Sequence, residues 1–270
     1  MSKPVVLIAE ELSPATIEAL GPDFEVRSAA RPRTSSIRPG RGALRGPGRD
    51  VTSRTTGEGL DATLSGADGV VHCADDTSSG DAVTVYATRR LADAAAALGV
   101  PLVHISIVGI DDHPMAYYRR KLRAEQGIEA AGGAATVLRA TQFHSLAAFF
   151  ARTLSAGPIT LTIGDMAFQP VDTNFVAARL ADLALGARPT AYLRATDIAG
   201  PDVLTIGEIA TLLRAHRGAS APHVVRLPPL GGTLRAFAER RNVPFPGDAQ
   251  TGGEAFASWL AAQPARLTGR

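Results

Sequence analysis

The sequence predicts an α/β protein built on a doubly wound parallel sheet, with a small C-terminal lobe. Short apolar runs alternate strictly with longer segments whose apolar residues recur at helical spacing. The runs at 68–73, 100–106 and 135–140 are each followed by such a helical segment. This alternation favours parallel strands joined by right-handed crossovers, with helices on both faces of the sheet.

The same pattern begins near the start of the chain. Ser13 and Pro14 are typical of a helix start, so we expect a helix from there to about Leu20, between strands at 4–9 and 24–27. The other helices expected in this half span 57–64, 81–98, 115–131 and 142–154.

Beyond residue 155 the alternation is lost. We therefore divide the chain into a sheet region, 1–155, and a C-terminal lobe, 156–270, packed on the same domain. Asp172 stands directly before an apolar helix, where it suits either an N-cap or a substrate contact. The later elements are strands at 159–163 and 191–198, helices at 174–185, 205–216 and 233–241, a linker at 247–253, and a last helix around Trp259.

The composition is that of an ordinary globular protein, with 270 residues, 45% of them hydrophobic and 20% charged. A single cysteine, Cys73, excludes an internal disulfide. We find no cleavable leader and no apolar run of about 18 residues. We therefore expect a cytoplasmic protein that does not bind a membrane.

The basic character of the chain is confined to one segment. The pI is about 9.0, but seven arginines and no acid lie between Arg27 and Arg49. Without these seven, acidic residues outnumber basic ones. Residues 28–49 are also rich in Gly, Pro and Ser, which predicts an irregular loop. No aromatic residues interleave these arginines, so a nucleic-acid partner is not expected.

Three polar residues point to proton chemistry. Ser106 ends an apolar strand, and Tyr117 and Lys121 stand four apart on the helix expected at 115–131. A lysine ammonium stabilises a neighbouring phenolate, so we expect the pKa of Tyr117 to be lowered toward neutrality. Such a phenol can give or take a proton at a carbonyl or alcohol oxygen, which a serine hydroxyl can hold.

Each of these residues also has a plainer interpretation. Tyr117 and Lys121 equally suit a solvated helix face, and Ser106 equally suits a simple strand end. Tyr118 is no substitute for Tyr117, because it lacks a lysine four residues on.

These residues lie within an ordered set of motifs, VVHCA, LVHISIVGID, YYRRKLRAEQ, TVLRATQF and FQPVD, which covers most of residues 68–172. From about residue 50 onward the chain resembles the short-chain dehydrogenase/reductase superfamily, most of all its atypical, NmrA-like NAD(P)-binding branch with a Rossmann-like fold. The resemblance implies Tyr117 as the general acid/base and Ser106 as the residue that orients the substrate oxygen. It implies Lys121 as the pKa partner of Tyr117 and a contact to the cofactor ribose.

The resemblance also implies a group of residues that line the cofactor, each of which follows a strand of the expected sheet. They are Asp50 near the adenine, Cys73 and Ala74 along the dinucleotide, and Thr141, Gln142 and Phe143 near the nicotinamide. Cys73 has an alternative role as a small buried hydrophobe.

The start of the chain departs from this family. Ala9 is followed by Glu10 and Glu11 instead of a glycine-rich turn, so two carboxylates stand where the phosphates of a dinucleotide would bind. Residues 3–26 instead resemble the N-terminus of D-3-phosphoglycerate dehydrogenase. We therefore expect a foreign strand–helix–strand in place of the first βαβ unit.

Three arginines bear on the choice of cofactor. Arg27, Arg31 and Arg33 follow the second strand, where basic residues meet the 2′-phosphate in enzymes that prefer NADP. NADP is therefore favoured over NAD. The alternative is that these arginines belong to a solvated loop.

The sequence thus predicts an NAD(P)-dependent oxidoreductase that transfers hydride to or from a small carbonyl or quinone-like substrate. The alternatives are a non-catalytic NAD(P)-binding regulator, or a pseudoenzyme whose dinucleotide binding is impaired by the missing glycine-rich loop. A small-molecule substrate is the expected partner, and a homodimer is compatible with this fold.

Overall fold

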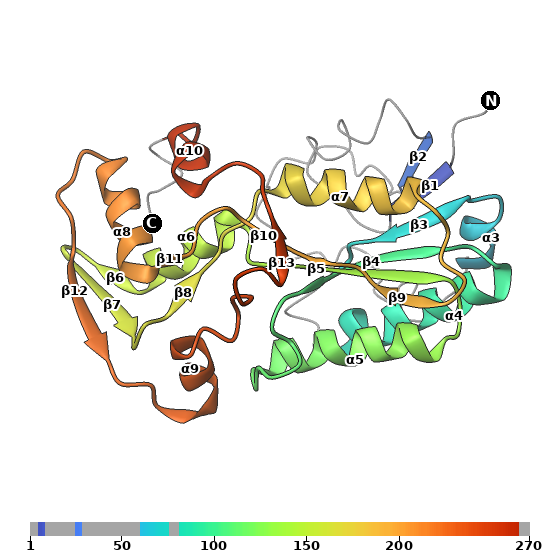
Figure 1. Cartoon of the computed structure of the whole chain (residues 1–270), viewed down its shortest axis with the longest axis horizontal. Helices are drawn as coiled ribbons and strands as arrows, with labels where there is room; N and C mark the ends of the chain where they lie inside the picture. The colour runs from blue at the N-terminus through green and yellow to red at the C-terminus, as the bar shows by residue number, and fades with distance from the viewer. Residues whose placement is uncertain (1–4, 9–24, 29–59, 76–80, 265–270) are drawn as a thin grey trace, which may run out of the picture.

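A computed structural model describes residues 5–8, 25–28, 60–75 and 81–264 (Figure 1). Its largest feature is an eight-stranded sheet in which every paired strand is parallel to its neighbour. The strands are β1 (Val5–Ile8), β2 (Glu25–Ser28), β3 (Gly69–His72), β4 (Leu102–Ile107), β5 (Ala135–Ala140), β9 (Tyr192–Arg194), β10 (Asp197–Ala199) and β13 (Ala249–Thr251).

The strand order is β13-β10-β5-β4-β3-β1-β2, and β9 pairs with the start of β5. β1 lies between β2 and β3, so the chain winds outward from β1 in both directions. This confirms the predicted fold class, a doubly wound parallel sheet. In such sheets the carboxyl ends of the strands share one edge, which is where ligands bind.

Helices cover both faces of the sheet (Figure 1). One face carries α3 (Leu60–Leu64), a π-helical segment η1 (Ala82–Ala87), α4 (Thr88–Leu98) and α5 (Ala116–Ala130), and the other carries α7 (Thr173–Leu185). Val70 packs on the α4 side and Val71 on the α7 side, as the two-residue alternation of a strand requires. Both are 1% exposed, which explains why the strands appear in the sequence as continuous apolar runs.

The lobe lies beyond one end of the sheet and has a core of its own (Figure 1). It contains a three-stranded sheet, order β12-β7-β6, and a two-stranded sheet, β11-β8. Phe168 and Ile206 are fully buried in its core. The elements are α6 (His144–Thr153), β6 (Ser155–Ala156), β7 (Ile159–Ile163), β8 (Ala167–Phe168), β11 (Leu204–Thr205), α8 (Ile206–Ala215), β12 (His223–Leu227), α9 (Gly231–Ala238) and α10 (Phe256–Ala261).

After residue 155 the chain returns to the large sheet, so the lobe is not one continuous segment. The strand expected at 191–198 is in fact two strands, because β9 pairs with the start of β5 and β10 with its end. The linker expected at 247–253 contains β13, which pairs in parallel with β10. β12 was not expected at all.

Local signals at two helix ends agree with the structure. Gly99 ends α4 in the left-handed region, with φ of 66°, as its position after an apolar helix predicts. Asp172 accepts hydrogen bonds from the backbone of Asn174 and Phe175, so it is the N-cap of α7. This decides between its two expected roles.

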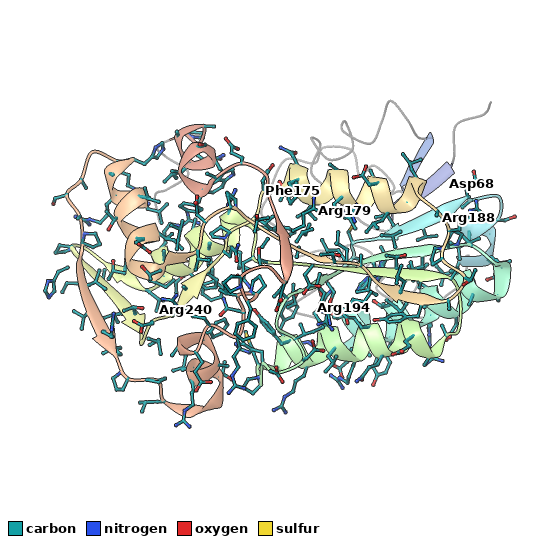
Figure 2. All side chains as sticks on the ribbon, in the orientation of Figure 1. Asp68, Phe175, Arg179, Arg188, Arg194 and Arg240 are labelled. Carbon is teal, nitrogen blue, oxygen red and sulfur yellow. The ribbon has the colours of Figure 1, made fainter. Side chains whose placement is uncertain are left out.

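A surface pair joins the segment after α7 to the turn before β3. Arg188 lies 3.7 Å from the carboxylate of Asp68 and donates to its backbone carbonyl (Figure 2). In the described part of the chain, no helix is both long enough and apolar enough to cross a membrane.

Candidate active site

Polar side chains gather where β3, β4 and β5 end. These strands are neighbours in one parallel sheet, so Asp75, Ser106 and Thr141 come to the same edge. Ser106 pairs in register with Arg139 of β5. Most of the site residues predicted from the sequence follow these strands.

Tyr117 and Lys121 lie on the first two turns of α5, on the face that packs against this edge. Lys121 is 3% exposed, and its Nζ donates to the backbone carbonyl of Ile105 at 3.0 Å. The plainer interpretation, a solvated helix face, therefore does not hold for Lys121. Arg120 also lies against Tyr117, with its Cζ 5.9 Å from the ring centre.

Tyr117 donates its phenolic hydrogen to the carboxylate of Asp75. Burial, together with the negative charge of Asp75, raises the pKa of Tyr117 well above its ordinary value. The expectation that Lys121 lowers this pKa is therefore wrong. Lys121 does lie 4.0 Å from Asp75 Oδ2, so its charge acts on the carboxylate that holds the phenol.

Burial also governs the neighbouring cations. It lowers the pKa of Lys121, while the negative charges of Asp75 and Glu125 oppose the shift. Beneath Lys121, His72 and His104 stack with ring centres 4.9 Å apart. Burial, reinforced by the charge of Lys121, lowers the pKa of His72 to about 3 and that of His104 well below its ordinary value. Both imidazoles are therefore neutral near pH 7.

Ser106 is 1% exposed, and its Oγ has no hydrogen-bond partner among the described residues. A buried hydroxyl without a partner is unfavourable, because it loses hydrogen bonds to water and gains none. Such a group is suited to receive a polar atom of a ligand.

Thr141 and Gln142 are buried and use their polar groups inside the protein. Thr141 donates from Oγ1 to the carbonyl of Gln169 at 2.5 Å. Gln142 donates from Nε2 to the carbonyl of Asn242 at 3.2 Å and lies 3.4 Å from the hydroxyl of Tyr118. These bonds join the end of β5 to the lobe.

The remaining predicted residues fall into two groups. Cys73, Ala74 and Phe143 are half-buried at the same edge. Arg27 is part of β2, where it pairs in register with Leu7, rather than following the strand. Ser28, where the expected loop begins, is the last residue of β2, while Asp50, the turn at 9–14 and residues 29–49 lie outside the described residues.

Sequence reasoning missed two residues of this site, Asp75 and Thr84. Thr84 lies in η1 and donates from Oγ1 to Asp75 Oδ1 at 2.8 Å. Asp75 comes directly after Cys73 and Ala74. Those two residues were selected because they follow a strand of the sheet, and the same criterion would also have found Asp75. No signal in the sequence indicates Thr84, because it looks like an ordinary member of an alanine-rich helix.

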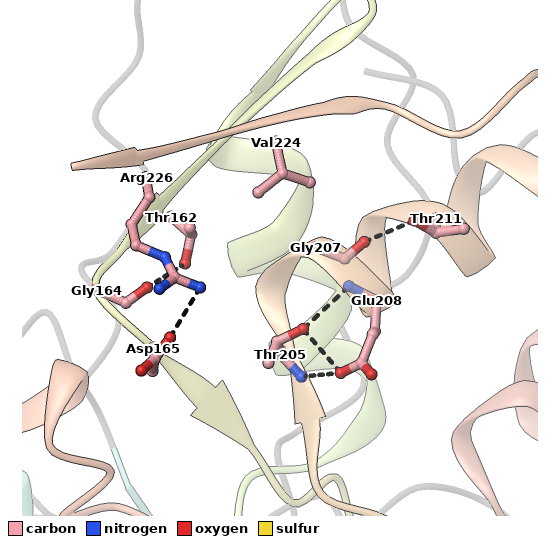
Figure 3. A pocket seen from close by; sticks show the side chains of 9 residues that line it. All are labelled: Thr162, Gly164, Asp165, Thr205, Gly207, Glu208, Thr211, Val224 and Arg226. Carbon is pink, nitrogen blue, oxygen red and sulfur yellow. Dashed lines mark hydrogen bonds and ion pairs between the residues drawn. The ribbon is translucent and has the colours of Figure 1, made fainter.

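A pocket of about 260 Å³ lies in the lobe, well away from these residues (Figure 3). It lies between the start of α8, which Thr205 and Glu208 cap reciprocally, and the pair formed by Arg226 and Asp165 at 2.9 Å. The site residues predicted from the sequence, among them Ser106, Tyr117 and Lys121, do not line this pocket. In the described residues, no group of three or more His, Cys, Asp or Glu side chains is arranged to hold a metal ion.

The sequence matches no protein-family model and no curated protein. The fold, in contrast, matches several solved structures. A nucleoside-diphosphate-sugar epimerase from Staphylococcus aureus is 14% identical, with a TM-score of 0.66 over 96% of this chain and 99% of that one. The Bordetella bronchiseptica enzyme WbmH, solved with NAD+, is 13% identical, with a TM-score of 0.63 over 97% of each chain.

An NADPH-dependent quinone oxidoreductase from Escherichia coli, QOR2, solved with NADPH, is also similar. It is 15% identical, with a TM-score of 0.59 over 98% of this chain and 92% of that one. At such identities the likeness extends to the fold alone. The chain therefore shares a Rossmann-like α/β fold with these solved structures.

Proposed function

We propose that this protein is an NAD(P)-dependent oxidoreductase of the atypical, NmrA-like short-chain type. It would transfer hydride between the dinucleotide and a small carbonyl or quinone-like substrate. The observation that carries the proposal is the meeting of Ser106, Tyr117 and Lys121 at the carboxyl edge of a doubly wound parallel sheet. In the solved structures with this fold, the bound ligands include NAD and NADPH.

The residues at this edge fit the nicotinamide half of a dinucleotide. An ammonium has three donors, and Lys121 gives one to Ile105, which leaves donors for ribose hydroxyls. The buried Oγ of Ser106 suits a substrate oxygen. Cys73, Ala74 and Phe143 would form walls of the site, while Thr141 and Gln142 would contribute shape, because their polar groups are already bonded.

When bound, NAD(P)H or NAD(P)+ supplies or takes the hydride. The part left to the chain is to hold one oxygen and move one proton. Ser106 would hold the substrate oxygen, and Tyr117 would pass a proton to it or from it. Lys121 would contact the ribose and keep a positive charge beside the proton transfer.

The test is consumption of NADPH and NADH with a panel of small aldehydes, ketones and quinones. In Tyr117→Phe we expect turnover to fall by about 10²-fold or more, because the transferable proton is gone. Tyr118→Phe is the matched control, since it deletes the adjacent hydroxyl, whose contact to Gln142 is long at 3.4 Å. Equal activity in the wild type and Tyr117→Phe would reject the proposal, and saturable NADPH binding without any turnover would favour a cofactor-binding regulator.

A further inference from the structure

Three side chains from two helical segments converge on the carboxylate of Asp75. Tyr117 of α5 donates to Oδ2 and Thr84 of η1 donates to Oδ1 at 2.8 Å. Lys121, one turn along α5, places its Nζ 4.0 Å from Oδ2. Each carboxylate oxygen thus has a donor, so the side chain of Asp75 is held in one orientation with Tyr117 against it.

The surroundings of Asp75 differ on its two sides. Thr84 is 1% exposed and the side chain of Lys121 is 4% exposed, so this side is dry. The side chain of Asp75 itself is 23% exposed, so a proton on it can exchange with water. Thr84 lies in a π-helical segment, a deviation from the α-helix that is frequent at functional sites.

We infer that Asp75 is the proton partner of Tyr117, a positioning residue that acts through the phenol. When Tyr117 receives a proton from the substrate, Asp75 takes up the proton that Tyr117 already carried. When Tyr117 gives a proton to the substrate, Asp75 returns one to Tyr117. This inference rests on the function proposed above. It assigns to Asp75 a role that the tyrosine and lysine alone do not fill.

We call this path, from the substrate oxygen through Tyr117 to Asp75, the relay. Its bonds and protons balance when an alcohol is oxidised. The substrate O–H bond breaks and a new O–H bond forms on Tyr117, while the former O–H bond of Tyr117 breaks and one forms on Asp75 Oδ2. A bound NAD(P)+ would supply the hydride acceptor, and the proton on Asp75 would pass to water at the exposed side of its carboxylate. Reduction of a carbonyl by NADPH or NADH follows the same steps in reverse.

Electrostatics explain why a relay is needed. Burial and the charge of Asp75 raise the pKa of Tyr117, so a free phenolate is strongly disfavoured. The relay avoids this species, because Tyr117 is neutral before and after each transfer. In the described part of the chain, the other titratable groups that act on Asp75 are Lys121 and His72. His72, whose pKa is about 3, is neutral in the working range.

The first test needs neither cofactor nor substrate. The protein is labelled with ¹³C-tyrosine, the Tyr117 signal is assigned from its loss in Tyr117→Phe, and its chemical shift is followed with pH. In Asp75→Asn we expect Tyr117 to titrate at lower pH than in the wild type, because the negative charge beside it is removed. Asp81→Asn is the matched control, since it deletes a different carboxylate of the same crossover, one that pairs with Arg123.

A Tyr117 signal that titrates identically in the wild type and Asp75→Asn would overturn the inference. Thr84→Val keeps the carboxylate but removes the donor to Oδ1, so it serves if Asp75→Asn does not fold. In Thr84→Val we expect a smaller change of the Tyr117 titration in the same direction, because Asp75 is held less firmly. No change in that variant would equally overturn the inference.

The second test uses turnover and its pH profile. In Asp75→Asn we expect kcat to fall by about 10²-fold, and in Asp75→Glu we expect partial recovery with an altered pH profile, because a carboxylate is again within reach. Full activity in Asp75→Asn would reject the relay and leave the proposed function standing. If Asp75→Asn alters the Tyr117 titration but the wild type shows no turnover, the proposed function would be rejected. The coupling between Tyr117 and Asp75 would still stand.

Discussion

Lys121 donates from Nζ to the backbone carbonyl of Ile105 at 3.0 Å, and this bond holds a buried ammonium at the carboxyl end of β4. Holding the charge there opposes stability, because burial lowers the pKa of Lys121. Asp75 and Glu125 offset part of that cost. A residue retained against its own desolvation is a strong candidate for a functional role.

We therefore expect Lys121→Met to separate activity from stability. Methionine is of similar length and needs no hydration, and Asp75, which is 23% exposed, keeps its donors Tyr117 and Thr84. The free energy of unfolding measured in urea should therefore change little. NADPH-dependent turnover should fall by about 10²-fold, because the charge beside the proton transfer is lost. A parallel loss of stability and activity would instead show that Lys121 is mainly structural.

His72 makes stability depend on pH. Its pKa is about 3 in the folded protein and about 6.5 in the unfolded chain, so the unfolded chain binds more protons between these values. Stability from this residue is therefore complete above about pH 6.5 and is lost as the pH falls toward 3. Between pH 7 and pH 5 we expect a loss of about 2 kcal/mol.

Urea unfolding of His72→Gln at pH 7 and pH 5 checks this. Glutamine keeps a polar partner for Thr88, whose Oγ1 lies 2.8 Å from His72 Nε2, but it does not titrate. The variant should lose about 2 kcal/mol less than the wild type between the two pH values. The same loss in both proteins would contradict the assignment.

Arg139 forms a buried ion pair that should show strong coupling. Its side chain is 3% exposed and donates to both oxygens of Glu125, which is 4% exposed, and also to the more exposed Asp111. Arg139→Met leaves the Glu125 charge buried without this partner, so we expect it to cost about 3–5 kcal/mol in urea unfolding. The double variant Arg139→Met, Glu125→Met should cost far less than the sum of the two single changes. Additive costs would show that the pair is not coupled.

Gly109 is expected to tolerate no side chain. Its φ is 84°, and a Cβ there would collide with the backbone oxygen of Arg241, where the end of the α9 segment meets the loop after β4. Gly109→Ala should therefore displace this contact and destabilise the protein by more than the roughly 1–3 kcal/mol of backbone strain alone. Gly99→Ala is the control, because Gly99 has a φ of 66° but a Cβ added to it would meet nothing within 4 Å. Equal losses in thermal or urea unfolding would show that the close approach to Arg241 is unimportant.

Strands that lie in the middle of the sheet were predictable. β3, β4 and β5 are covered on both faces, so most of their residues are apolar and the run itself marks the strand. β13, with the sequence AQT, becomes a strand only because β10 offers backbone partners to it. β12 pairs with β7, which is far away in the chain, and most of its side chains are exposed. Such pairings leave no apolar pattern to detect.

The residues of the candidate site likewise divide into those that the sequence predicted and those that it did not. Three predicted residues, Ser106, Tyr117 and Lys121, belong to consecutive elements. They were predictable because Tyr117 and Lys121 are four apart on one helix and Ser106 ends the strand before it. The carboxylate that controls Tyr117 and the Thr84 hydroxyl that holds it both come from a different crossover, the one between β3 and β4. The sign of the pKa shift of Tyr117 depends on that tertiary contact, which explains why the sequence-based expectation was wrong.

The order of the strands has a consequence for synthesis. β5 is completed early, but its partners β9 and β10 follow only after α6, β6, β7, β8 and α7 have been made. Throughout that interval the growing polypeptide on the ribosome presents an apolar strand with one open side, which is the kind of edge that recruits neighbouring chains. This edge is therefore exposed while the segment from α6 to α7 is translated, so slowing translation there would prolong the exposure of β5.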